Sequence, residues 1–597
     1  MPLDEILAAL SEERTWQHLT HITEHIPSRL AGTPNARRMA EYAAEHLADA
    51  GLDAGMDEFP GLVSFPEPTE VQALAPEAWA IEASTLAQSP STDGLEAELV
   101  YIGAGAEADY ERRDVRGKIT LTDLPYAPAR HEKAFIAARH GAIAQVMMNW
   151  GHPESAAIPL GSVKSAWGNP TPETLATEMP RIPCVGISLR DGLRLKAMCD
   201  VGPVRIRLRA SADNAWRRLT MTTGQLGIAP DRQFLLVGGH MDSWFGPQAT
   251  DNASGNACML ELARVFARHG DELRRGLVTA FWMGHETGTM ISSTRFADVN
   301  WDWLRRSCVA YLQIDQPAIA GTSTWHLAST EDTEGWATST AQEMLGDMDI
   351  HWRRQRKNGD SSFFGVGLST VAGLMSFRDD EIRATGLANL GWWHHSVHNT
   401  LDKVDRSLLA PHLRAYARWM WGLLTAPILP HTFAPFAGRI AARLDALARL
   451  NVPNIDMAGA AERARDFHAL AYRLDALTQS WRARPALPRL DADADAINRA
   501  LLELARTLIP VTSTTAGPYG QDRYGHSWQP EMIPALAPYA RLAGFDRDSE
   551  AFQTWWVDQV RARNRVADAL DRAAGIARSV LRELDDQPGL TSSHNRP

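Results

Sequence analysis

Short apolar runs alternate with polar segments through the middle of the chain, and three of these runs lead into histidine or acidic residues. The run FLLV (234–237) is followed by two glycines and His240, and the runs LVTAFWM (277–283) and VAYLQI (309–314) precede further candidates. Continuous apolar runs of this length predict buried strands of a mostly parallel sheet. Ligands collect beyond the carboxyl ends of such strands, so we expect a site there.

Helical periodicity flanks these runs. From Ala253 to about His269, apolar and charged residues alternate around a single internal glycine, Gly255, which predicts a helix packed on the sheet. Near the N-terminus, Thr33 is the expected N-cap of a helix with Pro34 at its first position and a stop at Gly51. Its apolar face consists of Met39, Tyr42, Ala43 and Leu47.

The pattern changes twice along the chain, which predicts a split α/β domain (1–58 and 213–426) with two additions. From about 59 to 212, short Val- and Ile-rich runs between Gly and Pro predict an inserted β-rich domain. These runs are AELVYIG, GKITLTD, AIAQVMMN, IPCVGIS and VRIRLRA. After a linker marked by Pro427, Pro430 and Pro435, an Ala-, Leu- and Arg-rich pattern predicts helices over 427–586. We expect the tail, 587–597, to be disordered.

The residues after the apolar runs have the chemistry of zinc ligands. Imidazoles and ionised carboxylates suit zinc, and an aspartate can bridge two ions. The candidates are His240, Asp242, Asp251, His285, Glu286, Asp315, His394, His395 and His398. Asp242 stands two residues after His240 and is expected to fix the tautomer of that ring. One such motif alone is weak, because a lone histidine beside a strand is more often structural, and we expect His398 to be solvated or structural.

Taken in order, the motifs resemble the two-zinc aminopeptidase and glutamate carboxypeptidase family of metallopeptidases, in its transferrin-receptor-like branch. The motifs are RLAGTPNARRMAEYAAEHLADAGLD, GGHMDS, ATDNASG, FWMGHETG, LQID and HHSVHNTLDKVD, and the resemblance spans nearly the whole chain. It implies an α/β fold of the zinc-peptidase type, with flanking helices on a mostly parallel sheet. The insert resembles a protease-associated domain, and the helical region resembles a dimerisation domain, although an appended bundle without a partner would show the same pattern.

The resemblance implies two Zn²⁺ per chain and a role for each ligand. If these residues have the roles of their counterparts in the family, His240 and Asp315 would hold one ion, Glu286 and His395 the other, and Asp251 would bridge them. Asp242 would support His240.

The chain departs from the family pattern at three positions. His285 stands where the family has a glutamate that acts as general base, and an imidazole can accept a proton at neutral pH. Asn399 replaces a usual aspartate. His394 stands where the glutamate carboxypeptidase-like branch has an oxyanion-stabilising tyrosine, a role open to an imidazole N–H.

The resemblance also suggests substrate contacts. Asp360, in KNGDSSFFGVG, is expected to accept a hydrogen bond from a substrate amine. The loop GPYGQDRYGHSW (517–528) would bring Arg523 and Tyr524 near the substrate opening. The basic run from Arg353 to Lys357 suits either a substrate carboxylate or a solvated face.

Composition limits the partners and the compartment. The 597 residues are 45% hydrophobic and 22% charged, as in ordinary globular proteins, and the net charge of -12 argues against nucleic acid or anionic membrane partners. Four cysteines without CxxC spacing suit a reducing cytoplasm. The N-terminus lacks the features of a signal peptide, and no window approaches 18 apolar residues.

The sequence therefore predicts a two-zinc hydrolase of peptide or amide bonds in small substrates, of the aminopeptidase, dipeptidase or carboxypeptidase type. Two alternatives stay open at this point. One is a hydrolase or acyl-transfer enzyme that acts on a non-peptide amide. The other is a receptor-like homologue without catalysis, which the altered base position would allow.

Overall fold

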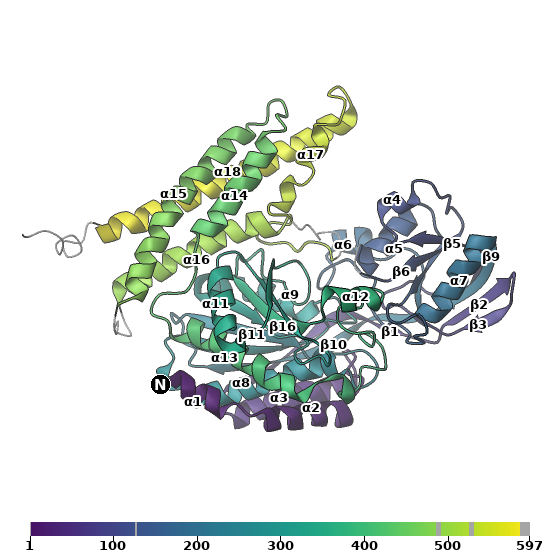
Figure 1. The fold of residues 1–597 in the computed structure, drawn as a ribbon, viewed down its shortest axis with the longest axis horizontal. Helices are drawn as coiled ribbons and strands as arrows, with labels where there is room; N and C mark the ends of the chain where they lie inside the picture. The colour runs from purple at the N-terminus through teal and green to yellow at the C-terminus, as the bar shows by residue number, and fades with distance from the viewer. Residues whose placement is uncertain (1, 126–127, 485–490, 525–530, 586–597) are drawn as a thin grey trace, which may run out of the picture.

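The computed structural model describes residues 2–125, 128–484, 491–524 and 531–585, which fold into three regions around two sheets (Figure 1). An α/β region carries the first sheet and the N-terminal helices. A second sheet lies to one side of it, at the right of Figure 1, and a group of long helices packs above it. The tail 587–597, for which disorder was expected, lies outside the described residues.

The first sheet has the strand order β1-β10-β12-β11-β13-β16-β14-β15. Its strands are β1 (Asp53–Pro66), β10 (Ala212–Leu226), β11 (Phe234–His240), β12 (Gly276–Trp282), β13 (Cys308–Gln313), β14 (Thr324–Ser329), β15 (Ile350–Arg354) and β16 (Thr370–Ser376). The central strands β12, β11, β13 and β16 are parallel, whereas β1 and β10 pair antiparallel with their neighbours. Strand β14 pairs antiparallel with β16 and parallel with β15. Every residue of β11, β12 and β13 is buried, which explains their continuous apolar sequences.

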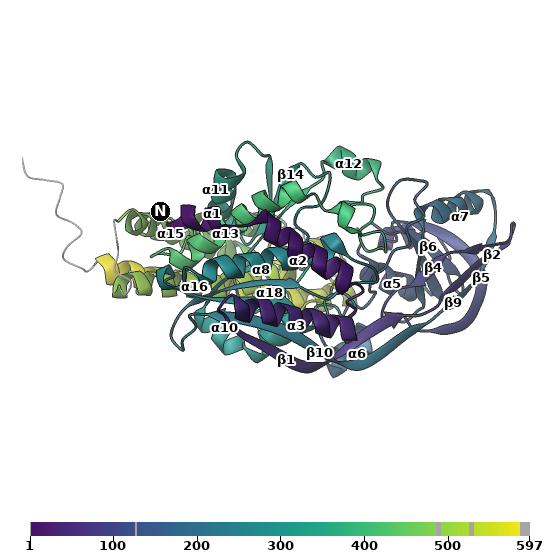
Figure 2. The same ribbon diagram turned by 90° about the horizontal axis from the view of Figure 1, so that it is seen from below.

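Helices flank this sheet, so the predicted α/β class is confirmed. The helices of this region are α1 (Pro2–Ala9), α2 (Glu12–His25), α3 (Pro34–Asp49), α8 (Ser254–Ala267), α9 (Ile291–Val299), α10 (Trp301–Ser307), α11 (Glu334–Leu345), α12 (Asp379–Ala384) and α13 (Leu409–Thr425). The side chain of Thr33 caps α3 and Pro34 opens it, as the sequence predicts. Helices α2, α3 and α8 lie side by side across one face of the sheet (Figure 2).

The second sheet belongs to the insert and has the order β3-β2-β9-β5-β6-β7-β8-β4. Its strands are β2 (Glu70–Ala75), β3 (Trp79–Ile81), β4 (Ala83–Thr85), β5 (Thr92–Gly103), β6 (Ile119–Asp123), β7 (Ala144–Met148), β8 (Cys184–Ile187) and β9 (Val204–Ala210). All five Val- and Ile-rich runs contribute a strand. The insert also contains helices that the β-rich pattern did not predict, namely α4 (Glu107–Tyr110), α5 (Arg130–Arg139), α6 (Pro172–Thr177) and α7 (Leu189–Val201).

A long two-stranded ladder joins the insert to the first sheet. Strands β1 and β10 pair without a break from Asp53 with Gln225 to Pro66 with Ala212. The boundary predicted between residues 58 and 59 therefore falls inside β1, where apolar and polar positions continue without a turn signal.

The C-terminal region is helical. Its helices are α14 (Ala434–Ala448), α15 (Met457–Arg482), α16 (Ala492–Ser513), α17 (Tyr539–Leu542) and α18 (Glu550–Asp585). Pro435 lies in the first turn of α14 rather than in the linker, a position that proline tolerates because the first N–H groups of a helix have no intrahelical partner. Among the described helices, none combines the length and apolar character of a membrane span.

Candidate metal centre

Three predicted ligands meet at the carboxyl ends of β11 and β13. His240 is the last residue of β11, Asp315 follows β13, and Asp251 lies in the short helical turn η1 (Ala249–Ala253) that leads into α8. Nε2 of His240 lies 3.0 Å from Oδ1 of Asp251 and 3.4 Å from Oδ1 of Asp315. The side chains of His240 and Asp251 are buried, so this group is shielded from bulk water.

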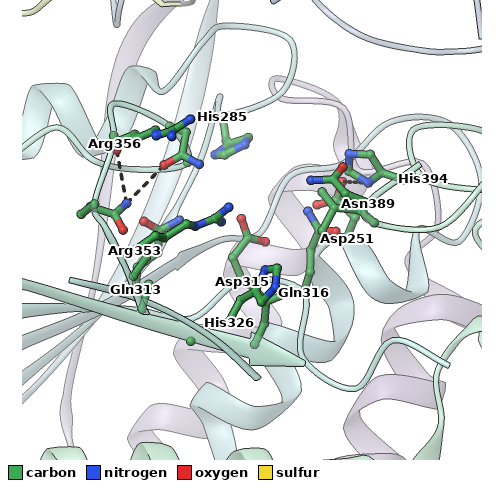
Figure 3. A pocket seen from close by; sticks show the side chains of 18 of the residues that line it. Asp251, His285, Gln313, Asp315, Gln316, His326, Arg353, Arg356, Asn389 and His394 are labelled. Carbon is green, nitrogen blue, oxygen red and sulfur yellow. Dashed lines mark hydrogen bonds and ion pairs between the residues drawn. The ribbon is translucent and has the colours of Figure 1, made fainter. Parts of the chain in front are cut away.

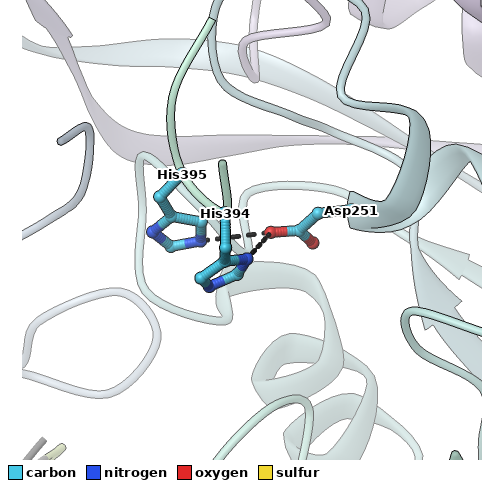
Figure 4. A group of neighbouring side chains, drawn as sticks. All are labelled: Asp251, His394 and His395. Carbon is cyan, nitrogen blue, oxygen red and sulfur yellow. Dashed lines mark ion pairs between the residues drawn. The ribbon is translucent and has the colours of Figure 1, made fainter. Parts of the chain in front are cut away.

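A second group forms on the other carboxylate oxygen of Asp251. Oδ2 of Asp251 lies 3.2 Å from Nε2 of His395 and 3.4 Å from Nδ1 of His394 (Figure 4). Nε2 of His395 is also 3.3 Å from Oε1 of Glu286, which follows β12. Asp251 therefore directs one oxygen to each group, the arrangement that a bridging ligand requires.

The residues present fit zinc. Among the described residues, several buried atoms that face the centre have no hydrogen-bond partner: Nε2 of His240, Oδ2 of Asp251, Oε1 of Glu286 and Oδ1 of Asp315. Buried polar atoms without partners are costly unless an ion or water satisfies them. Two sets of donor atoms are compact enough to hold a metal ion, His240 with Asp251 and Asp315, and Asp251 with His394 and His395. The second set makes His394 a candidate ligand, whereas the sequence predicted an oxyanion contact.

In the centre, the positive charge of imidazoles and the negative charge of carboxylates stabilise one another. Burial opposes charge on Asp251, but His240, His395 and His394 outweigh it and hold the pKa of Asp251 well below its usual range. Burial likewise opposes charge on His240, yet Asp315 and Asp251 raise its pKa well above the ordinary value. For His394, burial and the neighbouring His395 lower the pKa. Zinc ions bound here would replace protons as the positive charge.

Asp242 supports the centre through both its main chain and its side chain. Nδ1 of His240 donates to the main-chain oxygen of Asp242 at 2.9 Å, which leaves Nε2 to face the centre. The carboxylate of Asp242 instead accepts hydrogen bonds from the backbone N–H groups of His285 and Glu286, at 3.1 and 3.0 Å. The expected support of His240 thus runs through the backbone, and the carboxylate positions the next strand end.

Two further residues hold the segment that precedes Asp251. The buried guanidinium of Arg29 donates to the carbonyl oxygens of Met241 and Pro247, at 3.1 Å each. Asn399 accepts from the backbone N–H and the hydroxyl of Thr250 at 3.0 Å, and donates to Oε1 of Gln248 at 3.2 Å. An aspartate, the usual family residue at position 399, has no N–H for the contact with Gln248.

His285 lies beside the centre, against both His240 and Asp360. Its ring stacks on the ring of His240, with centroids 3.9 Å apart. Its Nδ1 lies 3.0 Å from Oδ2 of Asp360, whose side chain is buried. Burial and His240 favour the neutral ring, but Asp360 outweighs them and raises the pKa of His285 to about 9 in the metal-free protein. The carboxylate of Asp360 therefore contacts His285, where the sequence had suggested a substrate amine.

A cavity of about 260 Å³ opens beside the centre (Figure 3). Its lining includes Asp251, Asp315, His285 and His394 together with polar side chains of the β14–β16 edge, among them His326, Arg353 and Arg356. Tyr524 also lines this cavity. Arg523 instead forms an ion pair with Glu178 of the insert, at 2.8 Å. The end of the predicted loop, 525–528, lies outside the described residues.

The insert contributes residues that the sequence did not point to. Arg130, the first residue of α5, contacts Nδ1 of His395. Trp150 stacks on the ring of His394, with centroids 5.8 Å apart. No motif marks either residue, because they reach the centre from a different domain.

Known peptidases are similar to this chain in sequence and fold. Residues 222–420 match the model described as "Peptidase family M28". A probable glutamate carboxypeptidase of Arabidopsis thaliana is 22% identical over 527 residues, which cover 74% of this chain and 72% of the relative. The aminopeptidase YwaD of Bacillus subtilis is 24% identical over 413 residues, covering 66% of this chain and 81% of the relative.

Solved structures of peptidases have a fold similar to that of this chain. A zinc aminopeptidase from Bacillus subtilis superposes with a TM-score of 0.55 at 18% identity, covering 70% of this chain and 96% of its own. A peptidase M28 precursor from Shewanella amazonensis superposes with a TM-score of 0.57 at 18% identity, covering 70% of this chain and 95% of its own. Residues 222–420, which carry the metal-ligand candidates, match peptidase family M28, so the predicted resemblance to a family of metallopeptidases is confirmed.

Proposed function

We propose that the protein is a two-zinc metallopeptidase that cleaves peptide or amide bonds in small substrates. One observation carries this proposal: the two carboxylate oxygens of Asp251 face separate histidine-containing groups, at 3.0 Å from His240 and 3.2 Å from His395. The family relationship and the zinc aminopeptidases of similar fold support it. His240 and Asp315 would hold one ion, Glu286 and His395 the other, and Asp251 both.

Bound zinc ions would supply activated water and polarisation of the scissile carbonyl. The chain supplies the proton transfers. His285 would accept the proton of the attacking water at Nε2, since Nδ1 is directed to Asp360, and would pass it to the leaving amine. Positive charge at the centre favours the neutral ring that this step needs. His394 would stabilise the oxyanion or add a ligand to the second ion.

The cavity is the proposed substrate site. Its volume of about 260 Å³ and its polar lining suit a small, polar substrate such as a short peptide. Tyr524, from the C-terminal helical region, would close it on the side of the insert, where its ring packs on His131 with centroids 4.2 Å apart.

The decisive experiment combines metal analysis with turnover. The purified protein is loaded with zinc, its metal content is measured, and hydrolysis is followed on free dipeptides, N-blocked dipeptides and simple amides. We expect about two ions per chain and cleavage of one peptide class. Turnover of simple amides alone would favour the non-peptide alternative, and full metal loading without any turnover would favour a receptor-like homologue.

Two wider proposals rest on the resemblance: the insert, 59–212, would act as a protease-associated domain, and the helices of 427–586 would form a homodimer. A third, that the protein would act in the cytoplasm, rests on the four cysteines without CxxC spacing. Light scattering at micromolar concentration tests the dimer, and a monomer would refute it.

A further inference from the structure

The insert holds the turn 287–289, which directly follows His285 and Glu286. Each of the three carbonyl oxygens of this turn accepts a hydrogen bond from a residue of the insert. In the order of the acceptors, the donors are Nε2 of Gln88 at 2.9 Å, Nζ of Lys164 at 2.6 Å and the backbone N–H of Gly168 at 2.7 Å. The position of the turn therefore depends on the insert as well as on the sheet.

Lys164 is the charged member of this set of donors. Its side chain is buried, and Nζ donates to the carbonyl oxygen of Gly168 at 2.7 Å in addition to that of Gly288. Burial of a lysine is costly unless its ammonium has partners. An apolar side chain at this position would leave both carbonyl oxygens without these donors, which is also unfavourable in a buried place. Lys164 thus joins a loop of the insert to the turn of the peptidase region.

The turn needs such support because the backbone at its end is strained. Thr289 and Met290 both have a φ of 61°. This is the left-handed region, which residues with a side chain rarely adopt and which is a clear outlier for a β-branched residue such as threonine. Such conformations persist only where the surrounding structure holds them. The hydroxyl of Thr289 also donates to the carbonyl oxygen of Lys164, at 3.4 Å, so this lysine contacts the turn through its main chain as well.

The peptidase region holds the other end of the same segment. The backbone N–H groups of His285 and Glu286 donate to the carboxylate of Asp242, and the N–H of Met290 donates to the carbonyl oxygen of His285 at 3.2 Å. His285 and Glu286 therefore lie between a support in the peptidase region and a support in the insert. A shift of the turn on the side of the insert would move both side chains.

We propose that Lys164 and Gln88 are positioning residues, through which the insert fixes His285 and Glu286 for catalysis. Without these donors the turn relaxes from its left-handed conformation, and the imidazole of His285 leaves the place from which it accepts a proton. A displacement of about 1 Å at such a group can cost about 10²-fold in rate. The inference rests on the proposed function in one respect, namely that His285 and Glu286 take part in catalysis.

The test is Lys164→Met, which keeps an unbranched side chain and removes its donors. We expect kcat to fall about 10²-fold with little change in KM. We also expect faster exchange of the backbone amide hydrogens of residues 284–291, followed by mass spectrometry on the protein without substrate. Both measurements are made well below the unfolding temperature of the variant.

Lys133→Met is the matched control. Lys133 is also buried, and its Nζ also donates to two carbonyl oxygens, but both of these, in Asp123 and Pro125, belong to the insert. This variant should unfold at a lower temperature and keep the kcat and the amide exchange of wild type. An equal fall of kcat in the two variants would overturn the proposal, because it would assign the effect to loss of stability in the insert.

Gln88→Met provides a second test if Lys164→Met does not fold. It removes the hydrogen bonds of Nε2 to the carbonyl oxygens of Thr287 and Leu62, and it should change kcat and amide exchange in the same direction. A lower unfolding temperature with kcat and amide exchange as in wild type would overturn the proposal, and so would a rise in KM at constant kcat.

Amide exchange needs neither substrate nor turnover, so it separates this inference from the proposed function. Faster exchange in Lys164→Met of a protein that hydrolyses nothing would refute the proposed function and leave the support of the turn by the insert standing. Faster exchange together with an unchanged kcat in an active enzyme would refute the positioning role and leave the proposed function standing.

Discussion

Nδ1 of His285 lies 3.0 Å from Oδ2 of Asp360, and the carboxylate of Asp360 is buried. The family has a glutamate at position 285, which needs no orienting partner of this kind. A histidine has two inequivalent nitrogens, so its use as a base depends on which one is protonated. Asp360 favours the proton on Nδ1 and leaves Nε2 able to accept one.

Removal of His285 is expected to slow the chemical step and to leave the metal ions bound. A general base contributes about 10²- to 10⁴-fold, so His285→Ala should lose that factor in kcat. Metal content and kcat are measured on the same preparation. Loss of an ion would make His285 a ligand, and near-wild-type turnover would dismiss it as the base. His285→Glu, which restores the family residue, should recover part of the activity.

Asp360→Asn should lower kcat with little change in KM. An amide at position 360 no longer favours the Nδ1–H tautomer, and loss of such a partner costs about 10- to 100-fold. The measurements are kcat, KM and metal content, with the exposed Asp347→Asn as control. If KM rose and kcat stayed constant, Asp360 would be a substrate contact, as the sequence first suggested.

Asp251→Ala should remove both metal ions, because Asp251 is the one proposed ligand that faces both groups. Elemental analysis after desalting gives the metal content. Asp302→Ala, at an exposed position on α10, is the control and should keep two ions. Two ions retained by Asp251→Ala would contradict the bridging assignment.

His412 should make the metal-free protein less stable in mild acid. Its Nδ1 donates to Leu408 O, and its Nε2 accepts from the N–H of Met375 at 3.1 Å, so the folded protein holds the neutral ring. Burial lowers the pKa of His412 from 6.5 to about 4. The unfolded chain therefore binds a proton first, and the stability contributed by this residue is complete above pH 6.5 and declines as the pH falls toward 4.

By pH 4 this loss amounts to about 3 kcal/mol. Urea unfolding of wild type and His412→Gln at pH 7 and at pH 4.5 measures it, since a glutamine does not titrate. The difference in stability between the two proteins should shrink as the pH falls. A difference that is the same at both pH values would contradict the assignment.

Asn399→Asp, which restores the usual family residue, is expected to destabilise the protein by about 1–3 kcal/mol through an unsatisfied buried contact. The new carboxylate oxygen would face Oε1 of Gln248, whose own N–H₂ group already donates to the carbonyl oxygens of Phe245 and Ser396. Thermal unfolding measures the effect. Because the unfavourable contact is with Gln248, adding Gln248→Ala to Asn399→Asp should restore part of the lost stability. Equal stability of Asn399→Asp and wild type would disprove this account.

Much of the fold was predictable because local pattern and burial agree. The runs that became β11, β12 and β13 are apolar on both faces, and the helix at Thr33 has both its cap and its proline. The helices of the insert were missed because α5 has Arg130, His131 and Lys133 buried, so its sequence lacks an apolar face.

The site was predictable where ligands stand at strand ends, and less so where contacts join distant segments. Asp360 was placed near the substrate from its position in a loop, but its partner is 75 residues away along the chain. Arg130 and His395 are 265 residues apart. Neither pairing leaves a spacing or periodicity that a single sequence reveals.

The β1–β10 ladder allows the insert to be deleted without breaking the first sheet. Pro66 and Ala212 are cross-strand neighbours, so a tight turn between them would replace residues 67–211 and leave the first sheet intact. A chain shortened in this way would keep all five proposed zinc ligands. It would lose Arg130, which contacts Nδ1 of His395. The ladder thus separates the contacts that the insert makes with the metal centre from the sheet that carries the proposed ligands, so the two can be altered independently.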